Sequence, residues 1–364
     1  MMKPALRRLW LRLHRWVGLS LGLVLALVAL TGAAMIVWKP IDRALNPALF
    51  TAVQPAPASL DKARASLREA FGPEARFTLR PPREAQDTVW AFVSGPAHAT
   101  AYLDPASGRL LGWRGETDHL AGLMFELHSE LLLGDTGRNV LAVVAAAYLL
   151  LLATGVVLWW PVRWRQAFSV QWRARAPRLV MDLHKTGGAL LGVFIAVSIA
   201  SGAWMAWKPL ANWVNTFSSG KLPSAPPVAA AAGPRASLDR MVAHALQVHP
   251  GARVGYVVLP ARDEQAVRIR LALADDPHPN GLTSLWFHPA TGALLAGQRW
   301  NELPAGARNT TWIYPLHTGQ LGGAWHEALN AALGLTLAGL GGSGLWLWWR
   351  RRPRSATQPR SQAA

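Results

Sequence analysis

Residues 13–40 read LHRWVGLSLGLVLALVALTGAAMIVWKP, and residues 183–209 read LHKTGGALLGVFIAVSIASGAWMAWKP. Both stretches place a histidine, His14 or His184, before a long apolar run that closes at Trp-Lys-Pro. About 20 apolar residues are enough for a helix to cross a bilayer. The two stretches therefore predict two copies of one membrane-spanning unit, each headed by a histidine.

A second matched pair of histidines, His128 and His317, precedes two further apolar runs. The same number of residues separates each of them from the tryptophan pair that closes its run. Each is followed by a glycine-containing stretch, at 134–137 and 319–323, so we expect the backbone to break before the span begins. The pattern predicts an α-helical membrane protein with two tandem repeats and four transmembrane helices, at roughly 16–38, 140–160, 187–207 and 328–349.

Composition supports a membrane protein and excludes several kinds of cofactor. The 364 residues are 51% hydrophobic, and many of the 19 tryptophans stand at the ends of the four runs, as in an interfacial aromatic belt. The chain has no cysteine, which excludes disulfides, iron–sulfur centres and covalent c-type haem. No G-x-G-x-x-G follows a predicted strand, so we expect no nicotinamide or flavin domain.

The net charge of +17 comes from short segments beside the spans. Residues 1–15, 161–182 and 350–364 each hold five basic residues and at most one acidic residue, whereas 39–138 holds 11 basic and 12 acidic residues. This is the positive-inside pattern, and it argues against the alternative of a nucleic-acid-binding patch. We expect a bacterial inner-membrane protein whose termini and middle loop are cytoplasmic.

The segments between the first and second spans and between the third and fourth spans should therefore be periplasmic. The first span resembles a signal peptide, but its repeat partner is internal, so we expect both to be retained helices. The expected division is an N-terminus with the first helix, an external domain, the second helix, a basic loop, the third helix, a second external domain, the fourth helix and a tail. The bounds are 1–38, 39–138, 139–161, 162–182, 183–208, 209–326, 327–349 and 350–364.

The two external segments share a local pattern. Residues 102–112 and 286–296 each combine a short aromatic strand, an x-Pro-x-Ser/Thr-Gly turn and a second strand. Upstream, Ser59-Leu60-Asp61 and Ser237-Leu238-Asp239 each begin a short amphipathic helix that the Ser or Asp is positioned to cap. Each domain therefore reads as an α+β unit, with strands expected at 75–79, 88–93, 253–259 and 265–273. Residues 218–236 read as a linker.

Small residues follow the first two histidines at helical spacing. Gly18 and Gly22 lie four and eight residues after His14, as Gly188 and Gly192 do after His184. Residues four apart share a helix face, so these glycines would leave a smooth trough beside the imidazole for a flat porphyrin. The alternatives are close helix packing and an interfacial histidine.

Topology suggests how the four histidines pair. His14 and His184 lie at the inner ends of their spans, and His128 and His317 lie at the outer ends. The simplest arrangement is one bis-histidine haem at each membrane face, giving two non-covalent haem b groups; His326 is an alternative to His317. Basic residues near the inner pair (Arg15 and Lys185) are candidate partners of haem propionates, and so are two further arginines (Arg138 and Arg163).

These motifs, in this order from residue 10 to 352, resemble the PepSY-associated transmembrane family of bacterial iron-uptake proteins. The matching features are LHRWVG at 13–18, LHKTGG at 183–188, LHTG at 316–319, Thr154-Gly155 with its following tryptophan pair, and DPASG at 104–108. The resemblance implies two PepSY-like domains on a four-helix core. It also implies a di-haem reductase of ferric siderophores in which His14, His184, His128 and His317 are the axial ligands.

We therefore expect a haem-dependent ferric-chelate reductase that takes electrons from a cytoplasmic reductase or a quinol. Two alternatives stay open: a membrane-anchored PepSY binding or regulatory protein without haem, and a permease for an iron chelate. The apolar runs contain no acidic residue, which disfavours transport.

Overall fold

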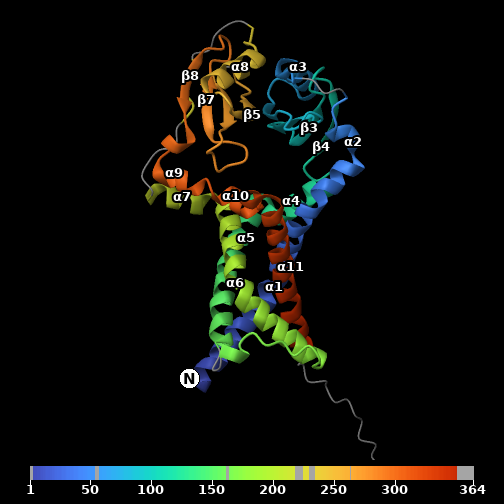
Figure 1. The fold of residues 1–364 in the computed structure, drawn as a ribbon, viewed down its shortest axis with the longest axis vertical. Helices are drawn as coiled ribbons and strands as arrows, with labels where there is room; N and C mark the ends of the chain where they lie inside the picture. The colour runs from blue at the N-terminus through green and yellow to red at the C-terminus, as the bar shows by residue number, and fades with distance from the viewer. Residues whose placement is uncertain are drawn as a thin grey trace, which may run out of the picture.

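The computed structural model describes residues 3–53, 57–160, 164–217, 224–228, 234–262 and 264–350. Four of its helices are long and apolar enough to cross a membrane: α1 (Pro4–Leu45), α5 (Gly134–Trp159), α6 (Ala176–Ala206) and α11 (Gly323–Arg350). Figure 1 shows them as an upright bundle with a β-sheet region at one end, opposite the end where α1 begins and α11 ends. The prediction of a four-span membrane protein with an α+β part is confirmed.

Within the bundle, α1 and α6 each pack against both α5 and α11. The centre of the bundle is largely aliphatic, with Leu25, Ile195 and Leu333 buried beside Tyr148. All four long helices extend beyond the predicted spans at one end or both; α1, for example, runs from Pro4 to Leu45, and α6 begins at Ala176 instead of residue 187. The apolar run marks the part of a helix that suits lipid, whereas polar residues with good helix propensity continue it into water.

The second pair of histidines lies on two short helices, α4 (Leu120–Glu130) and α10 (Ile313–Thr318). After α4 the chain passes through Leu131 and Leu132, both with positive φ, before α5 starts. After α10 it passes through Gly319 and Gly323, with φ of 81° and 59°. The predicted break between each histidine and its span is therefore confirmed.

The strands of the described residues form one antiparallel sheet with the order β4-β3-β2-β1-β5-β6-β7-β8. The sequence predicts a separate sheet for each external segment, but β1 and β5 pair antiparallel through Phe77↔Leu259, Thr78↔Val258 and Leu79↔Val257. The strands are β1 (Arg76–Arg80), β2 (Val89–Ser94), β3 (Ala99–Leu103), β4 (Leu110–Gly115), β5 (Arg253–Leu259), β6 (Val267–Ala272), β7 (Thr283–Phe287) and β8 (Leu294–Gln298).

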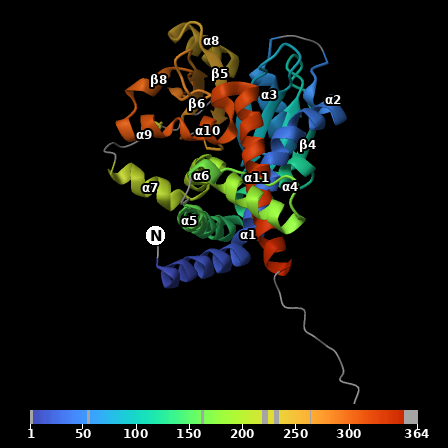
Figure 2. The same cartoon turned by 60° about the horizontal axis from the view of Figure 1, so that its bottom comes forward.

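Two helices, α3 (Leu60–Phe71) and α8 (Leu238–Val248), cover one face of the sheet. Leu67 of α3 and Met241 of α8 are buried against strand residues such as Phe77 and Phe287. Figures 1 and 2 place α3 and α8 on the side of the sheet away from the bundle. The opposite face of the sheet is therefore directed toward the bundle. The remaining α-helices are α2 (Pro47–Phe50), α7 (Lys208–Phe217) and α9 (Ala305–Thr310).

The N-terminus of each of the helices α3 and α8 is capped by an aspartate from the other helix. Ser59 accepts a hydrogen bond from the Lys62 N–H of its own helix, as predicted, but the aspartates cap the opposite helix. Asp61 Oδ1 accepts from Leu238 N at 2.9 Å, and Asp239 Oδ1 accepts from Leu60 N at 2.6 Å. A carboxylate is favourable at a helix N-terminus because free N–H groups and the helix dipole converge there.

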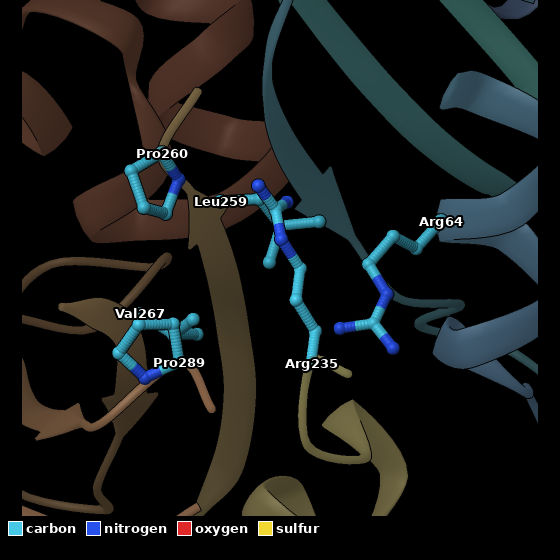
Figure 3. A pocket seen from close by; sticks show the side chains of 6 residues that line it. All are labelled: Arg64, Arg235, Leu259, Pro260, Val267 and Pro289. Carbon is cyan, nitrogen blue, oxygen red and sulfur yellow. The ribbon is translucent and has the colours of Figure 1, made fainter. Parts of the chain in front are cut away.

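Beside these caps, the seam between the two external segments is closely packed. A cavity of about 10 Å³ is lined by Arg64, Arg235, Leu259, Pro260, Val267 and Pro289 (Figure 3). A space of this size accepts at most one water molecule. The seam at this point is therefore a structural joint and not a ligand site.

Candidate functional site

The inner pair of histidines meets in the bundle from two different helices. The ring centroids of His14 on α1 and His184 on α6 are 6.3 Å apart. His14 Nδ1 is 2.8 Å from the hydroxyl oxygen of Thr154 on α5, and His184 Nδ1 is 2.8 Å from that of Ser343 on α11. All four long helices therefore contribute to this one site.

The hydroxyl groups settle which inner-pair nitrogen carries the proton. Thr154 donates to Leu151 O at 2.9 Å, and Ser343 donates to Leu340 O at 3.0 Å. Because a hydroxyl has one proton to donate, each oxygen is left as an acceptor for an Nδ1–H of the neighbouring imidazole. Both rings are thereby held in the tautomer whose Nε2 has a free lone pair.

The outer pair follows the same rule with backbone acceptors. The centroids of His128 on α4 and His317 on α10 are 6.1 Å apart. His128 Nδ1 donates to Val28 O at 2.8 Å, and His317 Nδ1 donates to Ser198 O at 3.0 Å. A carbonyl can only accept, so Nε2 is again the nitrogen with the free lone pair. Within the described part of the chain, none of the four Nε2 atoms has a hydrogen-bond partner.

A glycine stands beside each of the four rings. A Cβ added to Gly32 or Gly202 would lie 2.7 Å from Cε1 of His128 or His317, respectively. At Gly155 and Gly344 the corresponding distances to His14 and His184 are 3.4 and 3.6 Å. These four glycines are not among the predicted site residues, although the sequence carries a signal for them, a hydroxyl–glycine dipeptide on each long helix: Thr31-Gly32, Thr154-Gly155, Ser201-Gly202 and Ser343-Gly344.

The geometry of both pairs fits axial ligation of a haem iron. Two imidazoles that bind one metal from opposite sides, each nitrogen about 2 Å from it, have centroids about 6 Å apart. The ring planes differ by 88° in the inner pair and 37° in the outer pair. Either angle is compatible with ligation, because turning a ring about the line through the two ligating nitrogens does not move those nitrogens. No three His, Cys, Asp or Glu side chains cluster as metal ligands in the described residues. Each pair therefore offers two ligands, which suits a macrocycle that supplies four more.

The four glycines predicted to face haem differ in what they contact in the structure. Gly22 lies against the Gly341 backbone of α11, and a Cβ on Gly192 would meet Leu152 of α5 at 2.5 Å. These two serve close helix packing, the alternative role of such glycines. At Gly18 and Gly188 a Cβ would lie 3.8 and 3.9 Å from leucine methyl groups, and their haem-facing role stays a prediction.

The basic residues predicted to pair with haem propionates differ in whether they already have a carboxylate partner. Arg15 is exposed, whereas Lys185 lies 3.3 Å from the buried carboxylate of Asp182. Arg138 forms an ion pair with Asp135 at 2.7 Å, and Arg163 lies outside the described residues. For Lys185 and Arg138 the structure therefore shows carboxylate partners three residues earlier on the same helix, a spacing from which the sequence could have predicted both pairs.

His317, and not His326, is the partner of His128. Asn330 of α11 donates to His317 O at 2.8 Å, which ties α10 to the start of the span. His326 lies on α11 and has no ring contact with another histidine in the described part of the chain. The two candidates are therefore separated by geometry.

The outer pair reaches into the bundle. It lies at the level of residues 28–32 of α1 and 198–202 of α6. Residue 30 is 16 positions beyond His14, which at about 1.5 Å per residue is about 24 Å. This is less than the thickness of about 30 Å expected for the hydrocarbon core, so the two histidine pairs are closer to each other than the two surfaces of such a core.

Comparison with known proteins identifies a family over nearly the whole chain. The family described as the PepSY-associated TM region matches residues 11–351. The match includes both histidine pairs and the entire sheet. No curated protein matches the chain.

Proposed function

Because this chain belongs to the PepSY-associated transmembrane family, we propose that it is a haem-b oxidoreductase that passes electrons across a bacterial inner membrane to a periplasmic ferric siderophore. The observation that carries this proposal is the pairing of His14 with His184 and of His128 with His317, each with a free Nε2. Iron transport and a haem-free binding module both leave these paired, oriented imidazoles without a role.

The proposed orientation follows from charge. The described residues of the two basic segments, 3–15 and 164–182, belong to the end of the bundle opposite the sheet (Figure 1). The positive-inside rule makes that end cytoplasmic, so the sheet would be periplasmic. The matched spans, histidines and hairpins support two tandem repeats. We expect electrons to enter near the inner pair, from a cytoplasmic reductase or a quinol, and to leave near the outer pair.

The residues of the chain would hold and tune the cofactors. Haem, when bound, supplies reversible one-electron chemistry. The Nδ1 hydrogen bonds to Thr154, Ser343, Val28 O and Ser198 O fix each ring and raise the basicity of its Nε2. The buried aliphatic side chains around Ile195 would exclude water between the pairs. At the outer face Fe(III) would gain one electron from the protein, and the chelate binds the resulting Fe(II) less tightly and releases it.

A haem count with histidine variants tests this proposal. We expect the detergent-purified protein to show a Soret band, sharp α bands after dithionite reduction, and about two haem b per chain by pyridine haemochrome. His128→Ala should keep about one haem and should lose reduction of a ferric chelate. His326→Ala is the matched control and should keep both haems and the activity.

A colourless protein from cells supplied with haem would overturn the proposal and favour an anchored binding module. Two retained haems in His128→Ala would remove that residue from the site.

A further inference from the structure

The sheet face directed toward the bundle is lined by alternating arginine and aromatic side chains. Three arginines stand directly opposite an aromatic residue on the neighbouring strand: Arg80↔Trp90, Arg268↔Trp286 and Arg270↔Tyr256. Their guanidinium carbons lie 3.7, 5.6 and 5.5 Å from the ring centroids. We call this surface the arginine–aromatic face and include in it Phe92, whose ring contacts that of Tyr256.

In the described part of the chain, none of these three arginines forms a salt bridge with a carboxylate. Arg268 donates to the hydroxyl of Ser284, and Arg270 donates to Gly281 O. Two buried nitrogens of Arg80, Nε and Nη2, have no hydrogen-bond partner in the described part of the chain. The charges of Asp87 and Asp276 act on Arg80 and Arg270, but both carboxylates have other partners: Asp87 pairs with Arg43, and Asp276 accepts N–H groups of its own loop.

Three partly buried cations that form no salt bridge within the described residues are costly for a sheet that apolar residues would stabilise as well. Burial lowers the pKa of Arg80 and of Arg268 to about 10, which still leaves both charged at neutral pH. An anionic ligand would supply the missing charge, and planar guanidinium groups stacked on rings can receive it with little rearrangement. The face therefore has the character of a binding surface.

The edges of this face are covered while its centre is open. Phe50 of α2 packs on Trp90 and Tyr102 at one edge, and Val228 packs on Trp286 at the other. Phe92, near the centre, is 38% exposed. The open part therefore presents an aromatic ring among guanidinium groups.

The arginine–aromatic face is connected to the outer histidine pair. His278, which follows β6, stacks on Tyr314 of α10 with centroids 4.6 Å apart. Tyr314 is one helical turn before His317. A ligand on the face would therefore lie on the same side of the bundle as the outer pair and would contact elements that pack on α10.

We infer that the arginine–aromatic face binds the ferric chelate and that it selects an anionic, aromatic chelate of the catecholate class. This inference rests on the proposed function. Three catecholate dianions outweigh the charge of Fe(III), so a tris-catecholate complex is anionic and presents flat rings. Arginine attracts its charge, and Phe92 and Tyr256 offer rings for edge or offset stacking. A trihydroxamate complex is neutral and lacks the rings.

Redox-inert gallium(III) complexes separate binding from electron transfer. The full-length protein in detergent is titrated by calorimetry with a gallium tricatecholate and with a gallium trihydroxamate of similar size. We expect the tricatecholate to bind at least about tenfold more tightly, as one or two desolvated cation–ring contacts allow. Arg80→Gln and Arg268→Gln should each weaken tricatecholate binding about tenfold.

Two further variants keep the test interpretable. Arg240→Gln, an exposed arginine on the opposite side of the sheet, is the matched control and should leave the dissociation constant unchanged. Phe92→Leu probes the open centre without removing a charge and should weaken the tricatecholate alone. A melting curve identifies any variant that has failed to fold.

Equal affinity for the two gallium complexes, or an unchanged constant in Arg80→Gln and Phe92→Leu, would overturn the inference. Arginine-dependent gallium binding by a protein that carries no haem would leave this site standing while the proposed function fails. If the protein reduces ferric chelates and substitution of these residues does not change that activity, the proposed function stands and the chelate-binding site proposed here fails.

Discussion

Replacing Gly202 by alanine is expected to displace the imidazole of His317. The new Cβ would lie 2.7 Å from Cε1 and 3.4 Å from both Nδ1 and Nε2 of that ring. Carbon atoms in contact normally lie about 3.5–4.0 Å apart, so the ring must retreat by about 1 Å. Metal–ligand distances tolerate only about 0.2 Å, and Nε2 would therefore leave its ligating position.

The cost of this displacement can be bounded. Inserting a methyl group into a well-packed site costs about 1–3 kcal/mol, which corresponds to a loss of about 5- to 150-fold in affinity. Ring movement also strains the 3.0 Å bond from His317 Nδ1 to Ser198 O. At limiting haem, Gly202→Ala should fall from about two haems per chain toward one.

Gly344→Ala is the matched control because it introduces the same methyl group beside His184. Its Cβ would lie 3.6 Å from Cε1, an ordinary contact, so this variant should keep both haems. Pyridine haemochrome counts and reduced spectra of the two variants measured in parallel provide the comparison. Equal haem loss in both variants, or none in Gly202→Ala, would refute the reasoning from ring contacts.

Two other predictions concern the hydrogen bonds. Thr154→Val removes the hydroxyl that accepts the His14 Nδ1–H, which makes Nε2 a weaker electron donor to the iron. The midpoint potential of the inner haem, measured by spectroelectrochemistry, should therefore rise by about 40 mV, the equivalent of about 1 kcal/mol. Thr154→Ser keeps the hydroxyl and should leave this potential unchanged. Asp61→Ala leaves the hydroxyl of Ser237 and the N–H of Leu238 without their acceptor, so thermal unfolding should show a loss of about 1–3 kcal/mol. Burial opposes the shift, but the hydrogen bonds from Ser237, Leu238 and Asp239 and the charge of Arg64 hold the pKa of Asp61 below its usual value. This stabilisation is present above the unfolded pKa of about 3.9 and is lost as pH falls through the lower folded pKa. Asp61→Asn should remove this contribution to the loss of stability in acid. An acid unfolding transition that is the same in Asp61→Asn and in the native chain would contradict the prediction.

Local patterns in the sequence were sufficient to predict where the spans and strands lie and which four histidines form pairs. Apolar run length predicts membrane helices, and alternation with Pro-Gly turns predicts the hairpins at 102–112 and 286–296, which form β3–β4 and β7–β8. The pairing of β1 with β5 has no such signal because the strands are far apart in the sequence and either edge could have stayed free. The exchange of Asp61 and Asp239 between helix N-termini escaped prediction for the same reason.

The site was predicted as a list of imidazoles but not as a geometry. Spacing along one helix placed Gly22 and Gly192 on the histidine face, yet the neighbouring helices α11 and α5 occupy that face. Each glycine that touches a ring lies on a different helix from that ring: Gly32 of α1 touches His128 of α4, and Gly202 of α6 touches His317 of α10. Contacts of this kind depend on how helices pack, and the sequence of a single helix contains no information about its neighbours.

Both histidine pairs of the candidate site join a residue of the first part of the chain to one of the second. His14 and His128 come before the connection between α5 and α6, and their partners come after it. The sheet seam at β1 and β5 obeys the same division. A cofactor held between each histidine pair would therefore bind only the assembled protein, and ligand that binds the folded state alone stabilises it by mass action. The melting temperature should accordingly rise with haem occupancy in the native chain and should rise less in His128→Ala.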